Sequence, residues 1–102
     1  MRSEPLGRAT DAAVDADGIA FDLRPETYGG ATPRQLELTA DVLCFVGNGA
    51  AAVPPAPTTA NTAYHEAGST MLYTLDAKRE RKNYWYVYAV AGTAEIRISV
   101  FG

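Results

Sequence analysis

The feature that most constrains the fold is a strict alternation of side chains near the end of the chain. In residues 93–101, TAEIRISVF, aliphatic residues alternate with polar ones. Successive side chains of a β-strand point to opposite faces, so this period of two predicts a strand with one buried face and one wet face. Residues 83–90, NYWYVYAV, precede it, and Ala91-Gly92 separates the two stretches. We therefore expect these two stretches to form a β-hairpin.

Earlier segments have the same short, strand-like character. Residues 18–25 alternate, residues 35–39 and 41–46 give two strands or one bent strand, and residues 70–75 give another. Residues 47–62 hold three prolines within four positions, which excludes a helix or a central strand there. No segment keeps an apolar period of 3.6 residues. The fold class that we predict is all-β, a small antiparallel β-sandwich or a jelly-roll-like barrel.

Length and hydrophobic content indicate one folded domain. The chain has 102 residues, of which 47% are hydrophobic, and this suffices for a single modest core. Residues 1–18 are small, polar or charged and show no period, so we expect an extended N-terminal arm. The β-domain is then expected to span residues 19–102.

Charge limits the classes of partner. The net charge is −3, which argues against a protein that coats nucleic acid, because such binding requires many neutralised phosphates. Residues 1–76 carry four basic and ten acidic groups, whereas residues 77–102 carry five basic and two acidic groups. This asymmetry suits self-association or docking on an acidic neighbour, and two solvated faces explain it equally well.

The single cysteine and the absence of long apolar runs bear on location. Cys44 excludes an intrachain disulfide, and its place in the run DVLCFVG predicts a buried thiol. No stretch approaches the roughly 20 apolar residues of a membrane span, and the first 18 residues contain no secretory signal. We expect a soluble protein without membrane contact, made in a reducing cytoplasm.

The sequence offers no convincing catalytic or metal-binding motif. Residues 15–18, DADG, share a spacing with calcium loops, and Glu26 follows at the closing position, but strand-like sequence lies between them. His65 lacks the second histidine of a metallopeptidase motif. Ser69 lacks both the nucleophile-elbow glycines and a recognisable base. We expect no enzyme activity, no metal and no cofactor.

The aromatic residues of 83–90 divide between the two faces of their strand. Trp85 belongs to the face that matches the aliphatic row of the last strand, so we expect it in the core. The tyrosines belong to the other face, which we expect to be exposed and to form a protein interface. Packing of the tyrosines on the N-terminal arm or the other sheet is the alternative. The predicted interface consists of the tyrosines and the preceding basic residues: Tyr84, Tyr86, Tyr88, Arg79, Arg81 and Lys82.

Four segments, in this order, resemble a recurrent type of small β-sandwich virion protein of tailed bacteriophages, the head-decoration or cement protein. They are VLCFVGNG, PPAPTTANT, AGSTMLYTL and the closing YVYAVAGTAEIRISVFG. The resemblance covers the chain from Leu36 to its end. It implies a non-enzymatic structural protein of the virion, assembled in the host cytoplasm. It also implies binding to the major capsid protein or other virion subunits, in homo-oligomers that are often trimers.

Other functions compete with this hypothesis. A tail or neck accessory module would share the same features. A carbohydrate-binding module would use Trp85 or the tyrosines as sugar platforms. A nucleic-acid-binding sheet would combine the tyrosines with Arg79, Arg81 and Lys82, although the acidic balance of the chain disfavours it.

Overall fold

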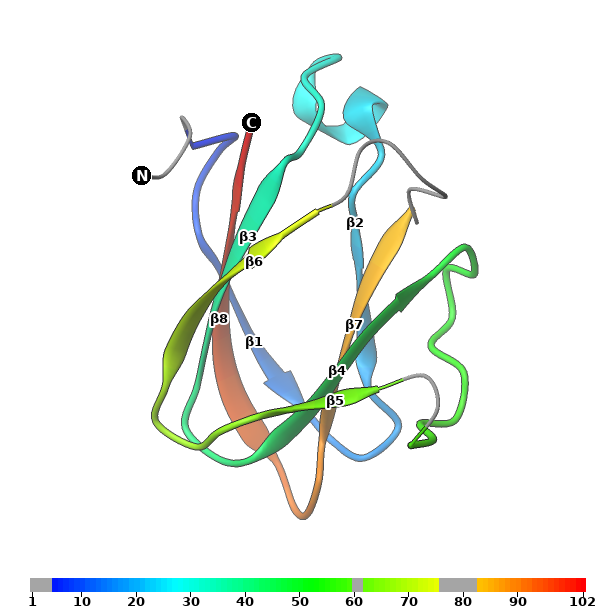
Figure 1. Ribbon diagram of the computed structural model, residues 1–102, viewed down its shortest axis with the longest axis vertical. Coiled ribbons are helices and arrows are strands. Elements are labelled where there is room, and N and C mark those ends of the chain that lie inside the picture. The colour runs from blue at the N-terminus through cyan, green and yellow to red at the C-terminus, as the bar shows by residue number, and fades with distance from the viewer. Residues whose placement is uncertain (1–4, 60–61, 76–82) are drawn as a thin grey trace.

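Two four-stranded antiparallel sheets pack face to face in the computed structural model (Figure 1). The structure describes residues 5–59, 62–75 and 83–102. The strands and one short 3₁₀ helix of these residues are β1 (Thr10–Val14), β2 (Ile19–Asp22), η1 (Pro25–Tyr28), β3 (Gln35–Ala40), β4 (Cys44–Gly49), β5 (Ala63–His65), β6 (Thr70–Thr74), β7 (Tyr84–Ala89) and β8 (Ala94–Phe101).

The strand order is that of a jelly roll. Sheet A has the order β1-β8-β3-β6, and sheet B has the order β2-β7-β4-β5. The first strand therefore pairs with the eighth, the second with the seventh, the third with the sixth and the fourth with the fifth. The chain behaves as one long antiparallel ribbon that doubles back at the β4–β5 loop and is then rolled into two layers. It is an open sandwich and not a closed barrel.

The core lies between the sheets and uses the alternation that the sequence displays. Trp85, Val87 and Ala89 of β7 point inward, as predicted, towards the aliphatic residues of β8. The last strand contributes Ile96 and Ile98 to the same core. The remaining buried core residues are Val14, Leu23, Leu36, Leu38, Ala40, Cys44, Val46 and Ala94.

The predicted hairpin of residues 83–90 and 93–101 is wrong. The two strands exist, but β7 pairs with β2 and β4, whereas β8 pairs with β1 and β3. The turn between them, with Gly92 at a φ of 65°, carries the chain from one sheet to the other. A hairpin and a crossover both leave one strand face buried, so the alternation alone could not distinguish them.

The prediction that residues 1–18 form an arm outside the sandwich is wrong for residues 10–14. Residues 10–14 form β1, the edge strand of sheet A, and Val14 is buried in the core. The Leu6 amide donates a hydrogen bond to the Val100 carbonyl, so pairing with β8 extends still nearer to the start of the chain. Residues 1–4 lie outside the described part. The sandwich thus includes residues that we had placed before its start at position 19.

The other strand predictions fare better. Residues 35–40 and 44–49 are two strands in different sheets, not one bent strand. The strands β2 and β6 fall within the predicted stretches 18–25 and 70–75. The short strand β5 has no counterpart among the predictions.

Candidate functional site

The outer face of sheet B is rich in aromatic side chains. Across three neighbouring strands, Tyr88, Phe45 and Tyr64 occupy paired positions of β7, β4 and β5. Tyr84 and Tyr86 continue the row along β7. We call this surface the aromatic face; it consists of Phe45, Tyr64, Tyr84, Tyr86 and Tyr88.

Part of the aromatic face is covered by the chain's own proline-rich loop between β4 and β5. The Tyr86 hydroxyl donates a hydrogen bond of 2.5 Å to the Ala51 carbonyl, and the Tyr88 hydroxyl donates one of 2.7 Å to the Pro55 carbonyl. Tyr88 is only 1% exposed, and burial raises the pKa of its hydroxyl. The prediction that these two tyrosines are exposed is therefore wrong. They hold the loop against the sheet.

Of the remaining members of the predicted interface, the structure describes Tyr84 alone. Tyr84 is half-buried, with the Arg24 guanidinium 5.6 Å from its ring centroid. Bidentate hydrogen bonds from Arg24 hold the pKa of the Asp22 carboxyl well below its ordinary value. The predicted basic members of the interface, Arg79, Arg81 and Lys82, lie outside the described residues. Their role at an interface remains a prediction.

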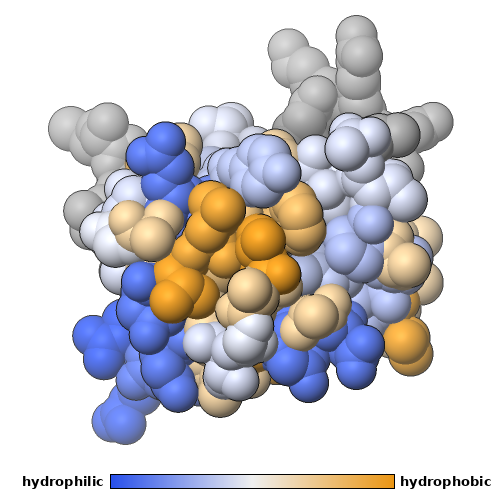
Figure 2. All heavy atoms as spheres, turned by 90° about the horizontal axis from the view of Figure 1, so that it is seen from below, coloured by the Kyte–Doolittle hydropathy of each residue, from blue (hydrophilic) through white to orange (hydrophobic). Residues whose placement is uncertain are grey.

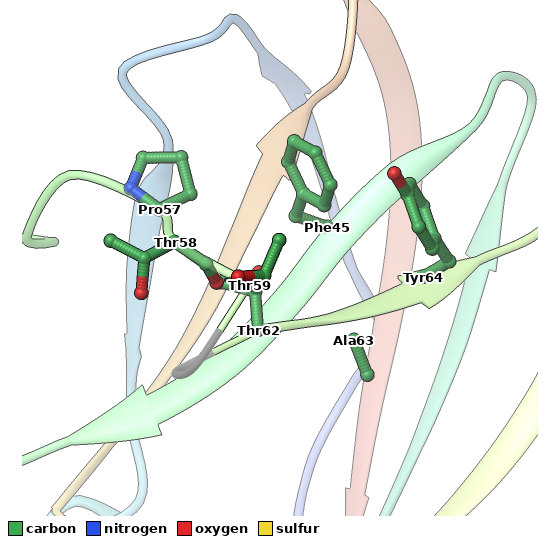
Figure 3. Close-up of a pocket in the computed structure, with 7 residues that line it drawn as sticks. All are labelled: Phe45, Pro57, Thr58, Thr59, Thr62, Ala63 and Tyr64. Carbon is green, nitrogen blue, oxygen red and sulfur yellow. Dashed lines mark hydrogen bonds between the residues drawn. The ribbon is translucent and has the colours of Figure 1, made fainter.

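A small pocket opens where the loop meets the uncovered part of the aromatic face (Figure 3). Its volume is about 220 Å³. The rings of Phe45 and Tyr64 lie on one side with their centroids 5.1 Å apart, and Tyr64 is 64% exposed. The loop side is fixed by the Thr62 hydroxyl, which donates a 2.6 Å hydrogen bond to the Thr58 carbonyl. The full lining is Phe45, Pro57, Thr58, Thr59, Thr62, Ala63 and Tyr64.

Trp85 is no part of this surface. Its side chain is 7% exposed and packs in the core with its ring 4.9 Å from that of Tyr73. The indole N–H is buried and has no hydrogen-bond partner among the residues that the structure describes. The prediction that Trp85 belongs to the core is confirmed, and this placement excludes it as a sugar platform.

His65 and Ser69 lie within hydrogen-bonding distance of each other, which the sequence did not indicate. His65 is fully buried; its Nδ1 lies 2.7 Å from the Tyr73 hydroxyl, and its Nε2 lies 3.0 Å from the Ser69 carbonyl and 3.3 Å from the Ser69 hydroxyl. The carbonyl contact requires a proton on Nε2, so this nitrogen cannot accept one from the hydroxyl. The hydroxyl itself donates to the Glu66 carbonyl. The cluster fastens the β5–β6 turn and is not arranged for nucleophilic catalysis.

The DADG stretch is a tight turn. The Asp17 amide donates to the Asp15 carboxylate at 2.9 Å, and the Gly18 amide donates to the Asp15 carbonyl. Gly18 has a φ of 84°, and a Cβ at this position would lie 2.3 Å from the Tyr88 ring. Both constraints require glycine. Among the residues that the structure describes, no group of three or more His, Cys, Asp or Glu side chains could hold a metal ion.

A second surface lies at one end of the sandwich, which is formed by four turns: residues 15–18, 41–43, 66–69 and 90–93. Leu43 and Val90 are partly exposed there, joined by a hydrogen bond from the Val90 amide to the Leu43 carbonyl. Figure 2 views this end and shows an apolar cluster flanked by hydrophilic side chains. The four turns contain acidic but no basic residues. We call this surface the acidic end; its carboxylates are Asp15, Asp17, Asp41, Glu66 and, at the start of β8, Glu95.

No protein-family model, no curated protein and no solved structure matches the chain. Within the described ranges, no helix is long and apolar enough to cross a membrane.

Proposed function

We propose that this protein is a non-enzymatic structural component of a virion, which binds the capsid surface and reinforces it through contacts with neighbouring subunits. The supporting observation from the structure is the jelly-roll strand order. Viral capsid proteins and lectins use this architecture widely. The described residues of the four sequence segments that resemble head-decoration proteins lie in the strands and loops of this sandwich.

The acidic end is the surface that best suits attachment. Leu43 and Val90 offer an apolar centre, and the surrounding carboxylates offer charge that would select a basic site on the major capsid protein. A single contact of this size is weak. Many copies on a symmetric shell would form many such contacts at once, and together these contacts would reinforce the shell.

The non-enzymatic character has support of its own. The hydrogen bonds of His65 and Ser69 hold the β5–β6 turn, as described above.

A co-sedimentation experiment tests the attachment. Purified protein is mixed with expanded capsids of the phage whose genome encodes the chain, prepared without this protein. We expect saturable binding that the double variant Leu43→Asn/Val90→Asn weakens strongly, because it removes the apolar centre without changing the charge. Val53→Asn is the matched control, because Val53 is an apolar residue that is 77% exposed in the β4–β5 loop. Failure of the unaltered protein to bind capsids would refute the function, whereas equal binding of the double variant would refute only the surface. Mass spectrometry of separated heads and tails distinguishes a head protein from a tail or neck accessory protein.

The pocket favours carbohydrate binding as a second candidate function. An exposed tyrosine ring beside threonine hydroxyls combines an apolar platform with hydrogen-bonding groups, and a volume of about 220 Å³ suits one sugar ring. Glycan-array binding that is lost in Tyr64→Ala and retained in Val53→Asp would support it. The absence of any glycan that binds in a Tyr64-dependent way would eliminate it.

A further inference from the structure

Sheet A ends in a strand whose second edge has no partner strand within the described part of the chain. The strand is β6, which pairs there with β3 alone. Its sequence, TMLYT, has no charge and no proline, and both Met71 and Leu72 are exposed. Natural sheets usually protect such edges with charged residues, prolines, bulges or very short strands, because an open edge pairs readily with another strand.

The other three edge strands of the described structure carry such protection. Strand β5 has three residues, and β2 has four and ends at Asp22, which is bonded to Arg24. Strand β1 carries Asp11, whose carboxylate accepts a 2.7 Å hydrogen bond from Arg97. Among the four edge strands of the described structure, β6 has none of these protections. Its open edge is therefore the one with which another strand would pair most readily.

The backbone of β6 determines which residues face the open edge. The Leu75 amide donates a 2.8 Å hydrogen bond to the Arg34 carbonyl of the chain segment leading into β3. Peptide groups of alternate residues point to opposite sides of a strand, so residues 71 and 73 also point to β3. Thr70, Leu72 and Thr74 therefore present their N–H and C=O groups to the open edge.

This pattern is self-complementary. If two copies of β6 meet antiparallel about a two-fold axis at Leu72, Leu72 faces Leu72, and Thr70 faces Thr74 of the other copy. Every residue with outward peptide groups then meets another such residue, and each pair can exchange both hydrogen bonds. Side chains match as well: the leucines meet across the axis, and Met71 faces Tyr73, a favourable sulfur–aromatic pair.

We propose that β6 is a self-association edge, through which two copies of this chain join their A sheets into one continuous sheet about a two-fold axis. This inference does not depend on the proposed virion role. It gives a dimer as the basic unit, in contrast to the trimer that the sequence resemblance implies.

Cross-linking tests the register. Facing Cα atoms of a hydrogen-bonded antiparallel pair are about 5.5 Å apart, which is within disulfide range. We expect Leu72→Cys to form an intermolecular disulfide under mild oxidation. Tyr64→Cys, at an exposed position on β5, should remain monomeric on a denaturing gel. Equal cross-linking of both variants, or of neither, would overturn the two-fold register.

Disruption tests the association itself. Light scattering after size exclusion should give twice the chain mass of 10.9 kDa for the unaltered protein. Leu72→Lys places two like charges opposite each other across the axis, so self-association should weaken about tenfold or more. Circular dichroism checks that the variant folds, and Val53→Lys is the matched control. A monomeric unaltered protein, a trimer, or a dimer unaffected by Leu72→Lys would refute the proposal.

Hydrogen exchange provides a readout independent of substitution. The Tyr73 amide bonds within the chain and should be protected at all concentrations. The Leu72 amide should be protected only at concentrations at which the dimer forms. Protection of Leu72 that does not depend on concentration would contradict pairing between copies.

Discussion

The hydrogen bonds from Tyr86 and Tyr88 to the proline-rich loop make a sharp prediction possible. Tyr88→Phe removes one hydroxyl that donates to the Pro55 carbonyl and leaves the ring in place. Pro55 is exposed, so water can replace the lost donor, and the cost should be that of a net hydrogen bond rather than of a buried unpaired group. We expect a loss of about 1 kcal/mol in the free energy of unfolding, which lowers Tm by about 4–8 °C in a domain of this size.

Tyr86→Phe should behave in the same way, because its hydroxyl donates to the Ala51 carbonyl of the same loop. Both bonds fasten one segment, so their losses should not be additive in the double variant. Urea unfolding gives the free energies, and limited proteolysis of the loop reports its local release.

Tyr64→Phe is the matched control for these variants. It makes the same chemical change on a side chain that is 64% exposed, so its effect should stay within about 0.5 kcal/mol. If Tyr88→Phe were no more destabilising than Tyr64→Phe, the loop would not be held by this bond, and the covered state of the aromatic face would need another cause.

Three further outcomes are expected. Gly18→Ala should destabilise by about 1 kcal/mol or more, because it forces a side chain into a φ of 84° and against Tyr88, and thermal unfolding measures this loss. Burial raises the pKa of the Tyr28, Tyr73 and Tyr88 hydroxyls above the ordinary 10.0, so stability should be full below pH 10 and fall as the pH rises further, as urea unfolding across that range would show. Burial also raises the pKa of the Cys44 thiol, so a thiol reagent should react only after denaturant unfolds the chain.

Much of the strand content was predictable because it depends on local pattern. The alternation in β7 and β8 correctly assigned Trp85 and Ile96 to the core, since side-chain direction follows from the strand geometry alone. Strand β1 was not predicted, because its sequence, TDAAV, carries only one large apolar residue, Val14. Its place in the sandwich depends on pairing with β8, far away in the sequence.

The pairing of strands was not predictable from local pattern. Residues 83–101 satisfy the requirements of a hairpin, and only the competition from β2, β4, β1 and β3 for the same edges decides against it. The burial of Tyr86 and Tyr88 was not predictable for the same reason. Their direction away from the core was correct, but the loop that covers them is brought there by the pairing of β4 with β7. The pocket could not be foreseen either, because Tyr64 lies on the unpredicted strand β5.

The rolled ribbon has a consequence for how the chain reaches its native state. Each sheet has one of the last two strands in its interior: β7 separates β2 from β4, and β8 separates β1 from β3. During synthesis, the earlier strands of a sheet therefore have no central neighbour until β7 or β8 has emerged. Folding then requires contacts across nearly the whole chain, such as that between Asp11 and Arg97, and such non-local topologies fold slowly, in milliseconds to seconds. A nascent chain that lacks β8 cannot form sheet A as described, because β1 would have no neighbouring strand in that sheet.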